Sequence, residues 1–236
     1  MNSYQLSDRL HTVASFVPKG SSIADIGSDH AYLPCYLGHQ LQIDKAVAGE
    51  VAEGPFQSAK RQVKEDSLEH LIEVRKGSGL EVIEAGEVDV ITIAGMGGPL
   101  IAQILEEGKD RLPGVKRLIL QPNINAISIR DWFSLNGWTI TDEAILEEDG
   151  KIYEVLVAEP ETDRMEMTFQ DRLLGPVLSK EKSHVFQKKW KQEYNQWEKI
   201  LNQIERAGDT SHLKDKKKEL LEKMKLVSEV LNWEKR

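Results

Sequence analysis

Short apolar runs alternate with helical stretches along the first 137 residues, and this alternation constrains the fold more than any other feature. Each run has the length of a buried strand, and longer stretches with helical spacing lie between most of them. Strands that alternate with helices form parallel sheets with covered faces. The expected strands are 23–26, 46–50, 71–74, 88–94 and 118–120, and the expected helices are 6–17, 31–41, 55–63, 100–107 and 127–135.

The alternation stops at residue 138, where two β-like runs, 138–146 and 152–157, follow each other with no helix between them. Asp149 and Gly150 lie in the join, and this pair accepts the positive φ angles of a tight hairpin turn. The sequence therefore predicts an α/β fold whose mostly parallel sheet ends in an antiparallel hairpin. This arrangement is similar to the Rossmann-like fold of class I S-adenosylmethionine-dependent methyltransferases.

The composition changes after Pro160, where glycine nearly disappears and Lys, Glu and Gln dominate. Two apolar series with helical spacing follow, and residues 208–210 interrupt them. We expect residues 1–160 to form one domain and residues 161–236 to form a helical coiled-coil hairpin. The aromatic side chains of the first series either form the core of this hairpin or stack on nucleic acid. The series are Phe186, Trp190, Tyr194, Trp197, Leu201 and Ile204, then Leu213, Leu220, Met224, Val227 and Leu231.

Charge is distributed unevenly along the chain, whose net charge is −8. Residues 1–160 contain 14 Lys/Arg and 25 Asp/Glu (net −11), whereas residues 161–236 contain 17 and 14 (net +3). The basic tail fits either an anionic partner or a solvated helix surface. Neither a signal peptide nor a membrane-spanning run is recognisable. The single cysteine, Cys35, fits a small buried residue in a cytoplasmic protein.

The segment Asp25–His30 follows the first strand, at the edge where open α/β sheets bind their ligands. Gly27 lets the backbone approach a ligand closely, with Ser28 beside it. The glycine pattern of NAD-binding turns is absent, and Asp25 and Asp29 would disfavour a pyrophosphate. The same carboxylates suit a cationic sulfonium, so S-adenosylmethionine is the expected cofactor, with NAD as an alternative.

Three further strand ends carry candidate cofactor residues. Glu50 ends the second strand, 23 positions after Gly27, where an acidic side chain can accept both hydroxyls of a ribose, with Val51 next to it. Glycine-rich turns follow the third and fourth strands and permit close backbone approach. The turn residues are Gly77, Ser78 and Gly79, then Gly95, Met96 and Gly97.

Amides at the end of the fifth strand are candidates for reading a base edge. Gln121, Pro122 and Asn123 stand there, and amide groups offer both hydrogen-bond donors and acceptors. Turn formation and helix capping are the alternative explanation for these residues.

Four segments together resemble the bacterial TrmK family of tRNA (adenine-22-N1)-methyltransferases: IADIGSDHAYLP (23–34), AGEVAEGP (48–55), VDVITIAGMGG (88–98) and QPN (121–123). The resemblance spans essentially the whole chain, and SDHAYLP and IAGMGG are its most distinctive parts. It implies a class I methyltransferase domain, S-adenosylmethionine as methyl donor, tRNA as substrate and a C-terminal coiled-coil domain. No metal is expected, and we expect a monomer.

Asp29 is the candidate catalytic residue for such a reaction, since the methylated adenine becomes cationic and a carboxylate stabilises that charge. Its alternative role is to cap the helix expected from residue 31. His30 and Tyr32 either contact the base or serve packing. Lys188, Lys189, Lys191 and the run 214–218 are candidates for phosphate contacts. A methyltransferase for small molecules or proteins and a non-catalytic interaction protein remain alternatives.

Overall fold

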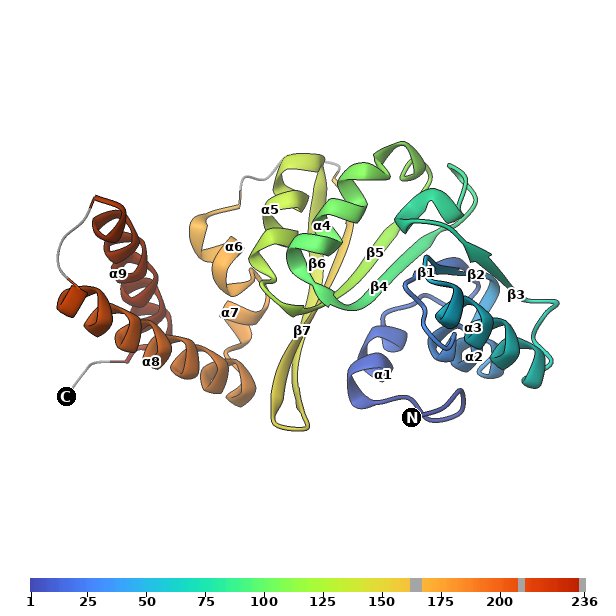
Figure 1. Ribbon diagram of the computed structural model, residues 1–236, viewed down its shortest axis with the longest axis horizontal. Helices are drawn as coiled ribbons and strands as arrows, with labels where there is room; N and C mark the ends of the chain where they lie inside the picture. The colour runs from blue at the N-terminus through green and yellow to red at the C-terminus, as the bar shows by residue number, and fades with distance from the viewer. Residues whose placement is uncertain (162–166, 208–210, 234–236) are drawn as a thin grey trace. The chain divides into compact units, whose positions relative to one another are not determined.

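The computed structural model describes residues 1–161, 167–207 and 211–233, and the chain divides into two compact units, residues 1–168 and 169–236. Unit 1 contains a seven-stranded sheet with the order β3-β2-β1-β4-β5-β7-β6 (Figure 1). Strands β1 to β5 are parallel, and β7 runs antiparallel to both β5 and β6. The expected parallel sheet with a terminal antiparallel hairpin is therefore confirmed. The strands are β1 Ser21–Ile26, β2 Ile43–Glu50, β3 Ile72–Lys76, β4 Val90–Gly97, β5 Arg117–Ile124, β6 Trp138–Glu148 and β7 Lys151–Pro160.

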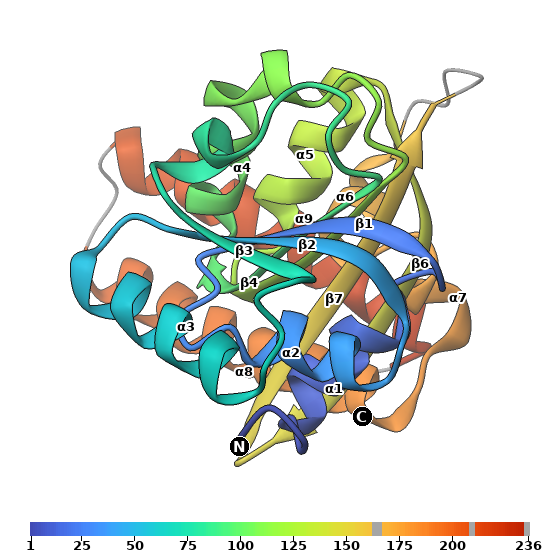
Figure 2. The same ribbon diagram turned by 90° about the vertical axis from the view of Figure 1, so that its right-hand side faces the viewer.

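Helices cover both faces of this sheet, as its apolar strands require. Figure 2 shows α4 and α5 on one face and α1, α2 and α3 on the other. Side chains from β1, β4 and β5 are almost completely buried between these layers, including Ile23, Ile91 and Leu118. The helices of unit 1 are α1 Asp8–Ser15, α2 Tyr32–His39, α3 Glu53–Glu65, α4 Gly98–Glu107 and α5 Ile127–Asn136, with 3-10 turns η1 Gly79–Val82 and η2 Lys109–Arg111.

Positive φ angles allow the hairpin turn between β6 and β7. Asp149 has a φ of 50° and Gly150 a φ of 73°, as the Asp-Gly pair predicted. Gly137, with a φ of 72°, caps α5 at its C-terminus and lets β6 begin at once.

Strands β4 and β5 are longer than the sequence predicted. Residues 95–97 and 121–123 were expected to follow the strands, but they lie inside the pairing of β4 with β5. Two register shifts, on either side of Met96, keep Met96 opposite Pro122. Gly95 adopts a φ of 80°, which a residue with a side chain rarely takes, so glycine lets the irregular strand continue.

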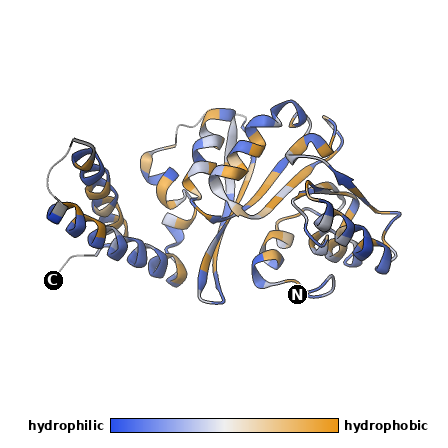
Figure 3. Ribbon diagram, in the orientation of Figure 1, coloured by the Kyte–Doolittle hydropathy of each residue, from blue (hydrophilic) through white to orange (hydrophobic). Residues whose placement is uncertain are grey.

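Unit 2 contains four helices in its described part: α6 Phe169–Leu174, α7 Leu178–Glu181, α8 His184–Ala207 and α9 Ser211–Leu231. The long helices α8 and α9 were predicted, whereas α6 and α7 are too short to show a period. Figure 3 shows hydrophobic residues interspersed with hydrophilic ones along α8 and α9. The aromatic series of α8 is buried, including Phe186, Trp190 and Trp197, so these rings form core and are not exposed for stacking. The predicted break at 208–210 lies outside the described residues.

Candidate functional site

The turn after β1 is built around the buried carboxylate of Asp25. The Ser28 hydroxyl donates a hydrogen bond to Asp25 Oδ2 (2.5 Å), and the Thr92 hydroxyl donates one to Oδ1 (2.7 Å). Burial raises the pKa of Asp25, although these two hydrogen bonds oppose the change. Asp25 therefore holds the turn together and also contributes to the wall of a pocket.

Gly27 has a φ of 71°, and its α-carbon faces the side chain of Met96. A β-carbon at residue 27 would collide with the terminal methyl of Met96. Glycine here is thus favoured mainly by the backbone conformation, because the flexible end of the Met96 side chain could move away from a β-carbon.

The N-terminal end of α2 carries three of the predicted residues, Asp29, His30 and Tyr32. Asp29 has a φ of 57°, its side chain is 70% exposed, and its backbone N–H donates a hydrogen bond to Glu50 Oε1. No side chain caps α2, so the predicted alternative role of Asp29 as a helix cap does not hold. The rings of His30 and Tyr32 stack with centroids 5.1 Å apart, and His30 Nε2 lies 3.8 Å from Asp29 Oδ1.

Glu50 connects the ends of β1, β2 and β3. Its side chain receives the Asp29 N–H, and its backbone carbonyl accepts a hydrogen bond from the Gly77 N–H (3.0 Å). Burial raises the pKa of Glu50, and the neighbouring carboxylates of Asp29 and Asp25 add to that rise. Val51, the next residue, is 66% exposed.

Residues 77–79 show ordinary turn chemistry. Ser78 and Glu81 form a reciprocal capping box at the start of η1. Gly79 has a φ of 52°, and a β-carbon there would lie 3.1 Å from Ile104. The position of this turn beside the carbonyl of Glu50 is compatible with a bound adenosine, but its side chains are used within the protein.

The amides of Gln121 and Asn123 bind the backbone of Gly95. Gln121 Oε1 accepts the Gly95 N–H (3.0 Å), and Asn123 Nδ2 donates to the Gly95 carbonyl (2.7 Å). Gln121 is fully buried, and its Nε2 donates to the carbonyl of Pro122 (2.8 Å). The expectation that Gln121 presents its amide to a base is therefore wrong for this conformation, because strand pairing continues past it and buries it.

A pocket of about 290 Å³ is lined by the β1 turn, the start of α2 and the irregular segment of β4. The other predicted site residues of unit 1 are not among its lining residues: Glu50, Val51, residues 77–79, Gly97 and residues 121–123. Arg9 and Leu10 of α1 and the N-terminal Met1 also line it, and the sequence did not point to them. The predicted residues that line it are Asp25, Gly27, Ser28, Asp29, His30, Tyr32, Gly95 and Met96.

Arg9 was missed because helical spacing identifies only the apolar face of α1. The position of α1 depends on distant contacts, such as the hydrogen bond from the Asp8 N–H to Glu148 Oε1 (2.6 Å). Arg9 donates a hydrogen bond to Gln121 Oε1, and its guanidinium carbon lies 5.4 Å from the ring centroid of Tyr153. No local pattern in residues 1–17 encodes these contacts.

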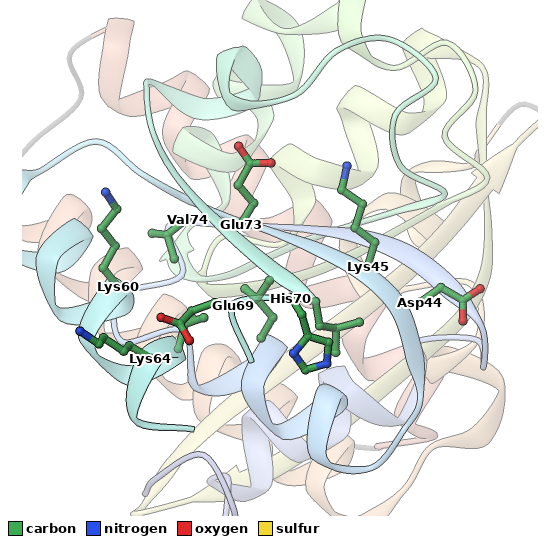
Figure 4. A pocket seen from close by; sticks show the side chains of 11 residues that line it. Asp44, Lys45, Lys60, Lys64, Glu69, His70, Glu73 and Val74 are labelled. Carbon is green, nitrogen blue, oxygen red and sulfur yellow. The ribbon is translucent and has the colours of Figure 1, made fainter. Parts of the chain in front are cut away.

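A larger hollow, of about 730 Å³, lies beside the outer strand β3, near the starts of β2 and β3 (Figure 4). Asp44 and Lys45 at the start of β2, His70 just before β3, and Lys60 and Lys64 of α3 line it. It contains none of the predicted site residues. Ligands of open parallel sheets bind at the carboxyl ends of the strands, so we assign the chemistry to the smaller pocket.

Three predicted lysines lie on α8 in unit 2. The ammonium group of Lys189 lies 4.9 Å from the ring centroid of Trp190, and that of Lys191 lies 5.8 Å from the ring of Trp233. Lys188 is on the same helix.

The described part of the chain contains neither a candidate metal-binding cluster nor a helix that could span a membrane. Its His, Cys, Asp and Glu side chains form no cluster of three or more that could hold a metal ion. None of its helices is long and apolar enough to cross a membrane. Burial raises the pKa of the Cys35 thiol to about 12, which disfavours a nucleophilic thiolate.

Comparison with known proteins gives consistent results. Residues 23–229 match the family model for TrmK, tRNA (adenine(22)-N(1))-methyltransferase. A relative from Bacillus subtilis with that same description is 54% identical over 98% of this chain and 99% of its own length. The crystal structure of the B. subtilis TrmK covers 97% of this chain and 99% of its own, with a TM-score of 0.92 and 54% identity. A Streptococcus pneumoniae protein described as a putative tRNA methyltransferase, solved in complex with S-adenosylmethionine, is 46% identical and has a TM-score of 0.87 over 96% of this chain and 100% of its own.

Proposed function

The chain belongs to the TrmK family of tRNA (adenine(22)-N(1))-methyltransferases, and on this basis we propose roles for the residues of its pocket. It transfers a methyl group from S-adenosylmethionine to N1 of adenine 22 in tRNA. The observation that carries the assignment of roles is the pocket itself, which brings Asp25 and Asp29 together beside Gly27. A cationic sulfonium fits this acidic, glycine-floored site better than a pyrophosphate does.

The cofactor occupies the carboxyl edge of β1, β2 and β4. Gly27 and Ser28 provide the turn against which it rests, and Asp25 supplies negative charge near its cationic end. The Glu50 carboxylate accepts hydrogen bonds from the ribose hydroxyls. The adenine ring packs near the exposed Val51, beside the turn 77–79, while residues 95–97 bound the site on the side of β4.

Asp29 is the catalytic residue in this proposal. When bound, S-adenosylmethionine supplies the methyl group: the lone pair of adenine N1 forms the new C–N bond while the C–S bond breaks, leaving S-adenosylhomocysteine and a cationic base. The exposed Asp29 carboxylate faces that developing charge and stabilises it. It also accepts a hydrogen bond from the N6 amino group.

His30 and Tyr32 contact the target base with their stacked rings. Adenine N1 takes part in Watson–Crick pairing, so a paired target base has to leave its stack before it reaches this pocket. The amides of Gln121 and Asn123 hold Gly95 in place through hydrogen bonds to its backbone, and the Pro122 carbonyl accepts a hydrogen bond from Gln121.

In this proposal, unit 2 supplies the main contacts that bind tRNA. Lys188, Lys189 and Lys191 contact phosphates, and the lysine-rich run 214–218 adds positive charge on α9. We further propose that the protein acts as a monomer in the cytoplasm, which light scattering on the purified protein and cell fractionation would test.

The decisive experiment is incubation with labelled S-adenosylmethionine and unmodified tRNA, followed by mapping of the modified nucleotide. We expect N1-methyladenosine at position 22. Label on another nucleotide, or on protein or a small molecule only, would reject the assigned acceptor. Calorimetry with NADH serves as a control, for which no binding is expected.

A further inference from the structure

The carboxyl ends of β4 and β5 are formed by two stretches of sequence without charged residues. Neither residues 90–105 nor residues 118–129 contain Asp, Glu, Lys or Arg, although these four types make up 30% of the chain. Pro99, Leu100 and Ile124 of these stretches are exposed, and Ile124 is 71% exposed. Phosphates attract cationic side chains, whereas bases are contacted by apolar ones, so this surface fits the bases of a nucleic acid better than its backbone.

Ile124 lies one strand away from the wall of the pocket proposed for the methyl transfer. It pairs with Gly97 of β4, and Gly97 directly follows Met96, which lines that pocket. A β-carbon on Gly97 would lie 3.9 Å from Ile124 Cγ1, so the isoleucine side chain lies directly beside β4 at this point. An exposed aliphatic group therefore stands next to the place where the target base enters the protein.

The backbone on both sides of Ile124 is fixed by contacts with β4 and with the start of α4. Asn123 Nδ2 donates a hydrogen bond to the Gly95 carbonyl (2.7 Å). Asn125 has a φ of 62°, and its carbonyl packs so closely on Gly98 that a β-carbon at residue 98 would collide with it. A β-branched side chain has few rotamers. Ile124 therefore loses little conformational freedom when it enters a contact, because its backbone is already ordered.

We propose that Ile124 is a wedge, which enters the base stack of tRNA and fills the place that adenine 22 leaves when it moves into the pocket. The inference rests on the proposed methylation at N1, because a paired target base has to leave its stack for that reaction. Extrusion of a base exposes the faces of its neighbours to water, and an inserted aliphatic side chain covers them. Pro99 and Leu100, exposed at the start of α4, extend the same uncharged surface for flanking nucleotides.

The first test compares two unmodified tRNAs as substrates of the full-length protein. Adenine 22 is paired in one of them, and a mismatch leaves it unpaired in the other. Ile124→Ala should lower kcat/KM on the paired tRNA about 10- to 100-fold, the effect of losing one stacking contact with a base. The loss on the mismatched tRNA should be much smaller, since an unpaired base leaves its stack more easily. Ile124→Leu keeps the aliphatic volume and should retain most of the wild-type kcat/KM on both tRNAs.

The second test observes base extrusion directly, with 2-aminopurine in place of adenine 22 and S-adenosylhomocysteine as the bound cofactor product. The fluorescence of 2-aminopurine is quenched in a base stack and rises when the base leaves it. The wild type should produce this rise on binding the paired tRNA, and Ile124→Ala should lose most of it while its affinity for S-adenosylhomocysteine stays the same. Leu135→Ala is the matched control, because it shortens an exposed aliphatic side chain at the far end of α5. It should change neither the fluorescence nor kcat/KM.

Three results would overturn the role of Ile124 as a wedge: wild-type kcat/KM of Ile124→Ala on the paired tRNA, an equal loss on both tRNAs, or an unchanged rise of fluorescence. An equal loss would place the side chain against the methylated base itself and not in the stack. Methylation of adenine 22 by the wild type, measured in parallel, shows that these results refute only the wedge. Absence of methylation of either tRNA by the wild type would refute the proposed function itself.

Discussion

Two buried carboxyl groups, Asp25 and Glu50, make cofactor binding dependent on pH. Burial raises the pKa of each above its ordinary value, which is 3.8 for Asp25 and 4.5 for Glu50. As the pH falls through the raised values, both groups gain a proton and lose the charge that attracts a cationic ligand. We therefore expect S-adenosylmethionine affinity to fall as the pH falls through these raised pKa values, and so at a higher pH than ordinary carboxyl groups would require. Calorimetry over a pH series measures the effect, and Glu50→Gln should reduce its amplitude.

The stability of the ligand-free protein should change in the opposite sense. A carboxyl group whose pKa is higher in the folded than in the unfolded state binds protons more tightly when folded. Between the two pKa values, the contribution of Asp25 and Glu50 to the free energy of unfolding therefore rises as the pH falls. If cofactor affinity proved independent of pH in this range, these carboxylates would not face the cofactor.

Asp29 should affect catalysis far more than cofactor binding. Asp29→Asn removes the negative charge beside the target base and keeps the size of the side chain. We expect kcat for tRNA methylation to fall about 100- to 1000-fold. The affinity for S-adenosylhomocysteine should change little, because the contact of Asp29 with Glu50 uses its backbone N–H.

Single-turnover methylation and calorimetry measure these two quantities. Asp44→Asn, an exposed carboxylate at the opposite edge of the sheet, is the matched control and should leave both unchanged. An Asp29→Asn enzyme with wild-type kcat would remove this residue from the mechanism.

A buried cluster of charges connects α5 to the β6–β7 hairpin. Arg130 is fully buried and bonds Glu143 Oε1 (2.6 Å) and Glu154 Oε2 (2.7 Å). Burial alone would lower the pKa of Arg130, but the carboxylates of Glu154 and Glu143 raise it, so the charge persists. Arg130→Met leaves two buried carboxylates without this arginine and should lower the free energy of unfolding by about 3–5 kcal/mol.

Urea unfolding of the full chain measures this loss. Arg111→Met provides the comparison, since its partner Glu84 is largely exposed and such pairs contribute about 0–1 kcal/mol. Equal losses in the two variants would show that burial does not determine the strength of the Arg130 cluster.

Elements with strong local patterns could be predicted from the sequence. The strands of the sheet, the long helices and the Asp149-Gly150 turn all follow from periodicity or from turn chemistry that a few neighbouring residues determine. The short helices α6 and α7 lack enough residues to show a period. The extension of β4 and β5 depends on pairing between strands, which a single strand does not encode.

The residues of the candidate site likewise divide into those that a local sequence pattern predicts and those that depend on distant contacts. Residues of the β1 turn could be named because a strand end, a glycine and two carboxylates lie together in the sequence. Arg9 could not, since its place depends on how α1 packs against the hairpin. The burial of Gln121 likewise depends on a neighbouring strand, and the predicted contact with a base failed for that reason.

At the scale of the whole molecule, charge separates the two parts of the chain. The methyltransferase part is strongly acidic (net −11 over residues 1–160), whereas residues 161–236 carry +3. A polyanion such as tRNA is repelled by the first part at long range and attracted by the second. RNA binding should therefore depend on unit 2 and strongly on salt, whereas cofactor binding should not depend on unit 2 and should depend on salt much less.

Replacing Lys188, Lys189 and Lys191 of α8 by glutamine tests this division. If each lysine contacts a phosphate, loss of all three reduces the slope of log K against log salt by about 2 units, because fewer counterions are released on binding. The affinity for tRNA at low salt should fall accordingly, while the affinity for S-adenosylhomocysteine stays the same. Filter binding over a salt series measures the slope. Lys45, Lys60 and Lys64, which line the larger hollow of unit 1, are the control set with the same change of charge. An equal change of slope in the control set would mean that only net charge matters, and a change in the control set alone would move the RNA-binding surface to unit 1.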